Sequence, residues 1–434
     1  MAATSTQDMV RPGECLDLFY YDGETSKKQC FPTTQNTKYV QQFANLTGGS
    51  SVFTIPPNSG IQDVVCNFQF AALAANPTNL ALPRGWGYAL IKQVSFRYGG
   101  SSQFFLTGDQ ILQNALRAQP NRSAATDLLT LGGNFASSGT TPSLANTQYA
   151  SVVLRLPHSI PSGVGKAHPF PTDLLTQQVQ ITVELYPVNQ IWTVNAGGSA
   201  AAAPTSLSNA TFQVQQVVLN NAGDALARRV DMAVNAYAFP CEFTQQKQQI
   251  DLGLTPAVVG SSQSVVLTGF RSGEVKAIHC WLTCSTDNAL VTGATGTYNP
   301  FVWYLPLSVI MTYAGDIYAR YENSTSPLWA LINGNKAPFV DNTYITTNTP
   351  PTAAALASGS QWVELPFAQT MVDEDAHYVL SHGKPITNGI VNLDIIVPAT
   401  PAGGTQGTSR WVLNVSYIYN STLLMSQGTA DYVF

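Results

Sequence analysis

The segment Gln178–Glu184 (QVQITVE) decides the fold class of this chain. Apolar and polar residues alternate strictly from Val179 to Glu184. Successive side chains of a β-strand point to opposite faces, so the alternation predicts a strand with one buried face and one wet face. A helix would need apolar residues three and four positions apart, and this segment lacks that spacing.

Runs of the same kind continue in both directions from this segment and make the chain all-β. They are rich in Val, Ile, Phe, Tyr and Thr and are bounded by Gly, Pro, Asn and Ser. The predicted strands are Val52–Ile55, Ile61–Phe70, Tyr88–Tyr98, Ser151–Leu156, Gln178–Tyr186, Phe212–Leu219, Val265–Phe270, Val275–Leu282, Phe301–Tyr313, Gln361–Leu365, Ile390–Val397 and Trp411–Tyr419. Helical spacing is clear only at Asp109–Ala118, where we expect a short helix inside a loop.

Four of these segments recur in the same order, 209 to 215 residues apart. Independent coincidences would scatter in order and spacing, so the chain is predicted to contain two copies of one β domain. The matched pairs are Ser51–Ile55 with Ser264–Thr268, Val94–Gly100 with Val309–Gly315, Val153–Pro157 with Trp362–Pro366, and Val179–Val183 with Val391–Ile395.

The repeat and the polar breaks divide the chain into three parts. We expect an N-terminal arm at residues 1–50, a first β domain at 51–223 and a second at 224–434, divided near Asp224. About eight strands and long connections in each copy suit a two-sheet sandwich of the jelly-roll type. Each copy carries a long polar insertion, Gln103–Ala150 and Asn323–Gln361, of the kind that usually serves function or surface decoration.

Composition narrows the classes of function. Of the 434 residues, 44% are hydrophobic and only 10% are charged, against roughly 25% charged in an average domain. A chain this apolar can offset its ordering entropy, so disorder is excluded. The net charge of -5 supplies no basic face for phosphates, so we expect no direct, sequence-specific nucleic-acid binding.

Targeting and redox signals are weak. Residues Met1–Cys15 lack the charged start and apolar core of a secretory signal, and Phe301–Tyr313 is too short to span a membrane. The six cysteines are too sparse for a disulfide framework, which favours a reducing compartment. They are Cys15, Cys30, Cys66, Cys241, Cys280 and Cys284.

Two groups of residues are candidates for catalysis or metal binding. His377 and His382 lie beside the acidic run Asp373–Asp375, but a charged loop before a strand is the simpler interpretation. Cys280 and Cys284 follow His279, yet positions four apart on a strand lie roughly 13 Å from each other, too far for one zinc ion. We therefore predict buried thiols, no catalytic, cofactor-binding or metal-ligating residue, and no enzyme activity.

Aromatic residues suggest a different function. Seven tryptophans could stack on sugar rings, but most lie in or beside predicted strands, where core packing is the usual role. Trp329, in a predicted loop, is the exception. Six Asn-X-Ser/Thr sites match the number that composition alone produces, so they are not interpreted as glycosylation sites. They are Asn45, Asn121, Asn209, Asn323, Asn414 and Asn420.

One stretch resembles a known family. Residues Leu90–Leu112 (LIKQVSFRYGGSSQFFLTGDQIL) are similar to the strand, Gly-Gly turn, strand and acidic helix start of double jelly-roll major capsid proteins. Val153–Pro157 followed by Pro169–Glu184 resembles the Pro-containing strand, loop and Val-rich strand of the same family. Through the internal repeat, the resemblance extends over nearly the entire chain.

The resemblance implies a structural function. Two eight-stranded jelly rolls would stand upright side by side, and three chains would give a pseudo-hexagonal homotrimeric capsomer of an icosahedral shell. The expected partners are the chain itself, neighbouring capsomers, penton and minor capsid proteins and an internal membrane if the virus has one, with no cofactor. The location would be the virion, assembled in the host cytoplasm or nucleus.

The resemblance also gives the other parts expected places. The two insertions would form outer loops, and residues 1–50 an arm at the base of the capsomer. The alternative from the residues themselves is a carbohydrate-binding tandem β-sandwich, a lectin or spike-like attachment protein. An enzyme on a jelly-roll scaffold ranks third, because no carboxylate pair or metal triad has a convincing spacing.

Overall fold

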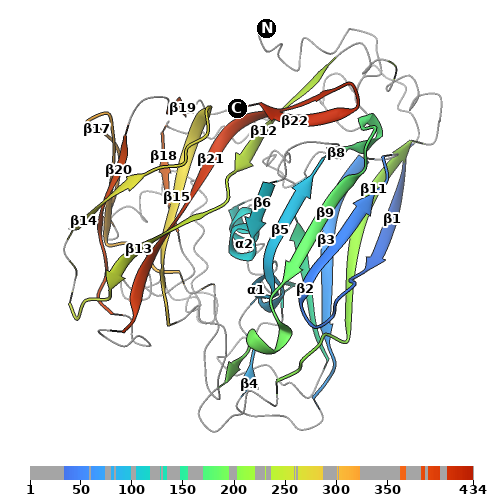
Figure 1. The fold of residues 1–434 in the computed structure, drawn as a ribbon, viewed down its shortest axis with the longest axis horizontal. Helices are drawn as coiled ribbons and strands as arrows, with labels where there is room; N and C mark the ends of the chain where they lie inside the picture. The colour runs from blue at the N-terminus through green and yellow to red at the C-terminus, as the bar shows by residue number, and fades with distance from the viewer. Residues whose placement is uncertain are drawn as a thin grey trace.

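Two β-sandwiches lie side by side in the computed structural model of this chain (Figure 1). The structure describes residues 34–57, 60–73, 80–82, 85–98, 104–117, 128, 131–133, 147–154, 170–194, 203–219, 230, 236–258, 260, 262–286, 301, 303–322, 362–367, 383–386, 390–400 and 408–433.

The first sandwich has the strand order of a jelly roll with four strand positions in each sheet, and β7 and β8 share one position beside β3. One sheet runs β1-β11-β3-β7, with the short strand β8 beside β3, and the facing sheet runs β2-β9-β5-β6. All of these pairs are antiparallel. The strands are β1 Thr34–Gln42, β2 Gly49–Ile55, β3 Gly60–Phe70, β5 Ile91–Arg97, β6 Phe104–Thr107, β7 Gln148–Leu154, β8 Phe170–Pro171, β9 Val179–Leu185 and β11 Asn209–Leu219.

Short elements complete the first jelly roll. Strands β4 (Leu80–Ala81) and β10 (Thr193–Val194) form a small ribbon at one end. Helix α1 (Trp86–Leu90) precedes β5, and helix α2 (Gly108–Arg117) follows β6.

The second sandwich is built in the same way. One sheet runs β12-β21-β15-β18, with β13 and β22 also paired with β21 and β19 with β15; the other runs β14-β20-β16-β17. The strands are β12 Tyr237–Thr244, β13 Gln248–Leu254, β14 Ser262–Leu267, β15 Glu274–Cys284, β16 Ser308–Tyr313, β17 Asp316–Glu322, β18 Val363–Pro366, β19 Lys384–Pro385, β20 Val391–Ile396, β21 Arg410–Ser426 and β22 Thr429–Val433.

The shared strand order confirms the predicted duplication. Strands β2, β9, β5 and β6 correspond to β14, β20, β16 and β17, and strands β11, β3, β7 and β8 correspond to β21, β15, β18 and β19. A β-bulge marks the same point in both copies, because the pairing of β11 with β3 skips Gln62 and that of β21 with β15 skips Lys276. Such bulges are built-in features of a sheet and anchor the register.

The register corrects two of the matched segments. Leu154 pairs with Val64, and Leu365 pairs with the equivalent Ile278, so Leu154 corresponds to Leu365 and not to Val363. Val179 pairs with Ile55 and Val391 pairs with Leu267, so Ile55 corresponds to Leu267 and not to Thr268. A slip of one residue moves every side chain to the opposite face of a sheet. Two Val-rich strings can be aligned by letters in either register, and only the pairing decides between them.

Part of the expected N-terminal arm is a strand of the first jelly roll. β1 pairs with β11 along its nine residues, and β2 begins at Gly49, so an arm ending at residue 50 is wrong. β1 reads TQNTKYVQQ, because an edge strand with a wet outer face carries little apolar sequence. Residues 1–33 and the expected divide at Asp224 lie outside the described residues.

Three other predicted strands have different boundaries in the structure. The segment Tyr88–Leu90, predicted as strand, belongs to the fully buried helix α1, where packing overrides local propensity. β16 begins only at Ser308, after Pro306, which cannot donate a ladder hydrogen bond. β21 continues to Ser426, well beyond the predicted end at Tyr419. Within the described residues no helix has the length and apolar composition needed to cross a membrane.

The sheets of each sandwich enclose an apolar core. Val179, Ile181 and Val183 of β9 are fully buried, as their alternation predicts. Six of the seven tryptophans are also buried, which confirms core packing as their role: Trp86, Trp192, Trp281, Trp303, Trp362 and Trp411. Trp329 lies outside the described residues.

Candidate functional site

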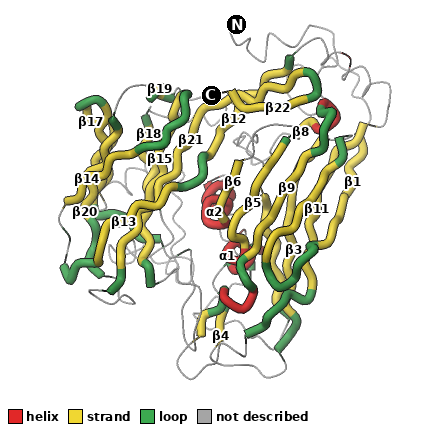
Figure 2. The backbone as a smooth tube through the Cα atoms, viewed as in Figure 1, coloured by secondary structure: helices red, strands yellow, loops and turns green. Residues whose placement is uncertain are grey.

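The two jelly rolls meet at a junction built around α2, which lies between them (Figure 2). The predicted helix is confirmed, and its residues Ile111, Leu112, Ala115 and Leu116 are buried. The helix lies between the two jelly rolls, however, and not in an outer surface loop. The chain turns from β6 into the helix at Gly108, where an added Cβ would strike the backbone carbonyls of Tyr88 and Ile91.

Asp109 begins the polar part of the junction. Its carboxylate accepts hydrogen bonds from the backbone N–H of Gln110, at 3.1 Å, and from the Thr107 hydroxyl. A carboxylate in the first turn also interacts favourably with the helix dipole. From the second jelly roll, Lys247 forms an ion pair with Asp109, and both side chains are largely buried. The pair therefore links the two domains where water screens it little.

The Gln110 side chain is buried, and both its amide nitrogen and its amide oxygen form hydrogen bonds. Its side-chain Nε2 donates to the backbone carbonyl of Gln245 at 2.8 Å and lies 2.9 Å from the Ser416 hydroxyl oxygen. Its Oε1 accepts from the backbone N–H of Thr107 at 3.3 Å. A buried amide satisfied in this way specifies one arrangement of the two domains, because any other would leave polar groups unpaired.

Aromatic rings form the apolar part of the junction. Phe104 of β6 contacts Phe243 of β12 edge-to-face, with centroids 5.7 Å apart. Tyr432 of β22 lies 5.4 Å from Phe104 and 5.2 Å from Phe243. Burial raises the pKa of Tyr432 and of the neighbouring Tyr98, whose ring centroids lie 6.3 Å apart, well above the ordinary tyrosine value. Both phenols therefore stay neutral in the folded protein.

The β21–β22 hairpin extends from the second jelly roll over one end of the first (Figure 1). At its turn, the Gly428 carbonyl accepts a hydrogen bond from the Thr176 backbone N–H at 2.9 Å. Gly428 has φ +77 and lies against the Thr176 side chain, so the turn needs glycine for its conformation and for its close approach.

The candidate metal ligands His279, Cys280 and Cys284 are buried in the second jelly roll. Cys280 and Cys284 are free and buried, which confirms the prediction of buried thiols. Burial raises the pKa of Cys280 to about 12, so its thiol stays protonated. His279 points to the opposite face of β15, with Nε2 3.2 Å from a Glu364 carboxylate oxygen. The described residues contain no cluster that could hold a metal ion.

The other candidate cluster, His377 and His382 with Asp373, Glu374 and Asp375, lies outside the described residues. Of the six Asn-X-Ser/Thr positions, Asn414 is fully buried and bonds to the Thr283 hydroxyl at 3.0 Å.

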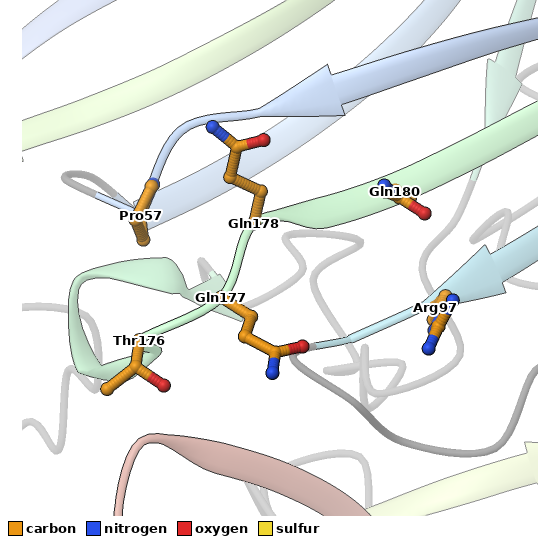
Figure 3. Close-up of a pocket in the computed structure, with 6 residues that line it drawn as sticks. All are labelled: Pro57, Arg97, Thr176, Gln177, Gln178 and Gln180. Carbon is orange, nitrogen blue, oxygen red and sulfur yellow. The ribbon is translucent and has the colours of Figure 1, made fainter.

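A polar depression of about 440 Å³ lies at one end of the first jelly roll. Figure 3 shows Gln177 and Gln178 on the segment that leads into β9, Gln180 within β9, and Arg97 at the end of β5. These side chains are exposed. Small-molecule sites are normally enclosed and largely apolar, so this depression lacks the features of one.

Comparisons with known proteins agree on one architecture. No protein-family model matches the sequence, and no curated protein does. Among solved structures, PBCV-1 VP54, a structure fitted into a reconstruction of the virophage Sputnik, has a TM-score of 0.61 at 12% identity, covering 94% of this chain and 98% of its own. The Sputnik virophage structure has a TM-score of 0.57 at 11% identity, over 92% and 88%. The mavirus major capsid protein has a TM-score of 0.51 at 10% identity, over 93% and 90%.

The fold is the double jelly roll of viral major capsid proteins. Both sandwiches of the double jelly roll are included in the match, since it extends over nearly all of this chain and of the relatives.

Sequence reasoning missed the residues that join the halves of the double jelly roll. Gln110 and Lys247 are ordinary polar residues in the sequence, with no motif around them. Tyr432 lies in a short C-terminal segment that carries a weak strand signal. Only the Asp109 helix start was singled out, because it forms part of the stretch that resembles the capsid family.

Proposed function

We propose that this chain is a major capsid protein whose biological unit is a homotrimeric, pseudo-hexagonal capsomer of an icosahedral virus shell. The observation that carries this proposal is the match of both sandwiches, in one chain, to viral major capsid proteins over 94% of this chain and 98% of PBCV-1 VP54.

Duplication gives a physical reason for the trimer. Three chains with two similar jelly rolls each supply six similar columns around one axis. A cyclic trimer uses head-to-tail contacts that close after three steps, so it requires two different, complementary flanks. Two non-identical jelly rolls provide such flanks, and a charged fraction of 10% suits interfaces whose buried centres are depleted of charge.

The same proposal names the partners and the location. Capsomers contact neighbouring capsomers, penton proteins and minor capsid proteins, with many modest contacts that add up through multivalency. The protein resides in the virion after assembly in the host cytoplasm or nucleus, and it works as a structural protein without a cofactor.

The tryptophans that suggested a sugar-binding protein pack inside the sandwiches in six of seven cases, which removes most of the support for that alternative.

Light scattering on the purified full-length chain tests the proposal. Three chains of 46.5 kDa give a mass of about 140 kDa by tripling, and negative-stain images of the same fraction should show pseudo-hexagonal outlines. A stable monomer of 46.5 kDa at micromolar concentration would contradict the proposal.

A further inference from the structure

Strand β14 forms one edge of the second jelly roll. It pairs only with β20 in its sheet, and it lies on the side of the domain that faces away from the first jelly roll (Figure 1). Its sequence SQSVVL contains no charge and no proline, and its six residues pair with β20 without a bulge. Charges, prolines and bulges are the devices that normally keep an unpaired edge from binding another strand. This edge lacks all three.

The backbone groups on the outer side of β14 have no described partner. On β20 the Ile396 carbonyl accepts from the backbone N–H of Leu307, so it points toward β16 and away from β14. Backbone groups of successive strand residues point to alternate sides, so Ser262, which is paired with Ile396, points away from β20. Ser264 and Val266 point the same way. No described residue bonds to the backbone of these three residues, which we call the open edge.

The equivalent edge in the first jelly roll is closed by side chains. By the register given above, Ser50 and Thr54 of β2 correspond to the first and last residues of the open edge. Asn45 Nδ2 donates to the Ser50 carbonyl at 3.2 Å, and Gln41 Nε2 donates to the Thr54 carbonyl at 3.3 Å. In the second jelly roll the side chain of Gln263 donates instead from β14 to a carbonyl of β13, at 3.0 Å. That bond leaves the backbone of the open edge uncapped.

We propose that the open edge pairs with the open edge of a second copy of this chain, in a neighbouring capsomer, as two antiparallel β14 strands about a two-fold axis. The inference rests on the proposed function, and it names a contact between capsomers rather than a contact within one. Ser264 lies opposite Ser264 of the second copy, and Ser262 lies opposite Val266. Main-chain hydrogen bonds of an added strand then supply the affinity.

The chemistry of β14 suits a second copy of itself. An antiparallel pair about a two-fold axis uses the same surface on both partners, so each open N–H meets an open carbonyl. Pairing β14 with itself brings no charged residue into the new ladder. Other edge strands of the chain would bring one: β1 carries Lys38, β17 carries Arg320 and Glu322, and β18 carries Glu364. The carbonyls of β2 are already capped.

Two matched proline substitutions test the contact. Ser264→Pro removes one N–H of the open edge, and Val52→Pro makes the same change at the equivalent place on β2. Proline is tolerated on an edge strand where the N–H faces solvent, so both variants should keep the mass of three chains and the native circular dichroism spectrum. Ser264→Pro should raise the concentration at which trimers associate by about tenfold, because a symmetric pair loses two hydrogen bonds. Val52→Pro should leave that concentration unchanged. Sedimentation velocity over a concentration series measures both.

A cysteine substitution gives a readout that does not depend on the proline. The Cα atoms of a hydrogen-bonded antiparallel pair lie about 5.5 Å apart, within the range of about 4.4–6.8 Å that a disulfide spans. After mild oxidation of the associated Ser264→Cys protein, we expect mass spectrometry to find a disulfide that joins position 264 of two chains. The native chain, oxidised in the same way, is the control.

Three results would overturn the contact and leave the trimer standing. They are association of Ser264→Pro at the native concentration, a disulfide from position 264 only to other cysteines, and native trimers that stay at three chains up to their solubility limit. A monomeric native chain would instead overturn the proposed function itself.

Discussion

At the scale of single residues, Gln110 links the two jelly rolls through one side chain. Its amide bonds to a carbonyl and lies within bonding distance of a hydroxyl of the second jelly roll, and all three residues come from different elements or connections. A buried donor or acceptor left without a partner costs about 1–3 kcal/mol, more than a typical hydrogen bond contributes. The junction is therefore sensitive to the loss of this one group.

Replacing Gln110 by alanine should lower the free energy of unfolding by about 0.5–1.5 kcal/mol, because its hydrogen bond to the Gln245 carbonyl is lost while the Ser416 hydroxyl still donates to that carbonyl at 2.9 Å. Urea unfolding followed by tryptophan fluorescence measures the change. The control is Gln180→Ala on the exposed face of β9, which should change stability by less than about 0.5 kcal/mol. Equal effects of the two substitutions would mean that the junction does not depend on this amide.

A second prediction at the residue scale compares Gly428 with Gly315, which serves as the control. Both have positive φ, +77 and +95, but a Cβ at Gly428 meets Thr176 of the first jelly roll, whereas nothing lies within 4 Å of one at Gly315. Gly315→Ala should cost about 1 kcal/mol of backbone strain. Gly428→Ala should cost about 1 kcal/mol more, since the hairpin must also move from Thr176. Thermal unfolding of both variants measures the difference, and equal losses would contradict the contact.

At the scale of elements, β21 is the strand that connects the two domains. Its 17 residues exceed the usual strand length of about 3–10. The first part of β21 pairs with β13 and β15 in the second jelly roll, and the last part pairs with β12 and β22 beyond the end of β15. The second jelly roll thus places Tyr432 against the aromatic end of the first.

Deleting residues 427–434, which include β22, should loosen a part of the first jelly roll that lies more than 300 residues away in the sequence. Without Tyr432, the rings of Tyr98 and Phe104 lose a packing partner. Hydrogen exchange should therefore become faster in β6 and at Tyr98 and stay unchanged in β2, which has no described contact with the hairpin. Unchanged protection of β6 would show that the hairpin only rests on the first jelly roll.

At the scale of the molecule, polar and aromatic contacts join two similar domains. Buried ionisable groups occur in both of these domains. Cys66 and Tyr98 lie in the first jelly roll, and Cys241 and Tyr432 in the second. Burial raises the pKa of each, to about 12 for Cys241. The folded state holds these groups neutral where the unfolded chain would ionise them.

This difference in protonation between the folded and unfolded states predicts that the free energy of unfolding falls at alkaline pH. The unfolded chain loses thiol protons near pH 9.0, the ordinary value, while the folded state keeps them. The stabilisation is therefore complete below pH 9.0 and declines above it, by about 1.4 kcal/mol per pH unit for each buried thiol. Urea unfolding at neutral pH and at about pH 10.5 measures the decline, and Cys66→Ala should make it smaller. A free energy of unfolding that is constant over this range would contradict the prediction.

The sequence alone determined the all-β class and the duplication. The alternation in QVQITVE indicates that one face of the strand is buried, and the four ordered matches indicate a repeated domain. Both patterns can be recognised in the sequence without knowledge of the contacts. The sequence did not predict β1. This edge strand has a solvent-facing outer side and too few apolar residues to reveal a strand.

Only the tertiary structure decided how the two domains meet. The partners of Gln110 are 135 and 306 residues away, so no window of sequence contains both sides of the bond. The one-residue register of β2 against β14 was likewise settled by pairing, because Val-rich strings fit in either register. Burial of one strand face can be read from a strand's own residues. Which neighbour covers that face depends on elements that meet only after the chain has folded.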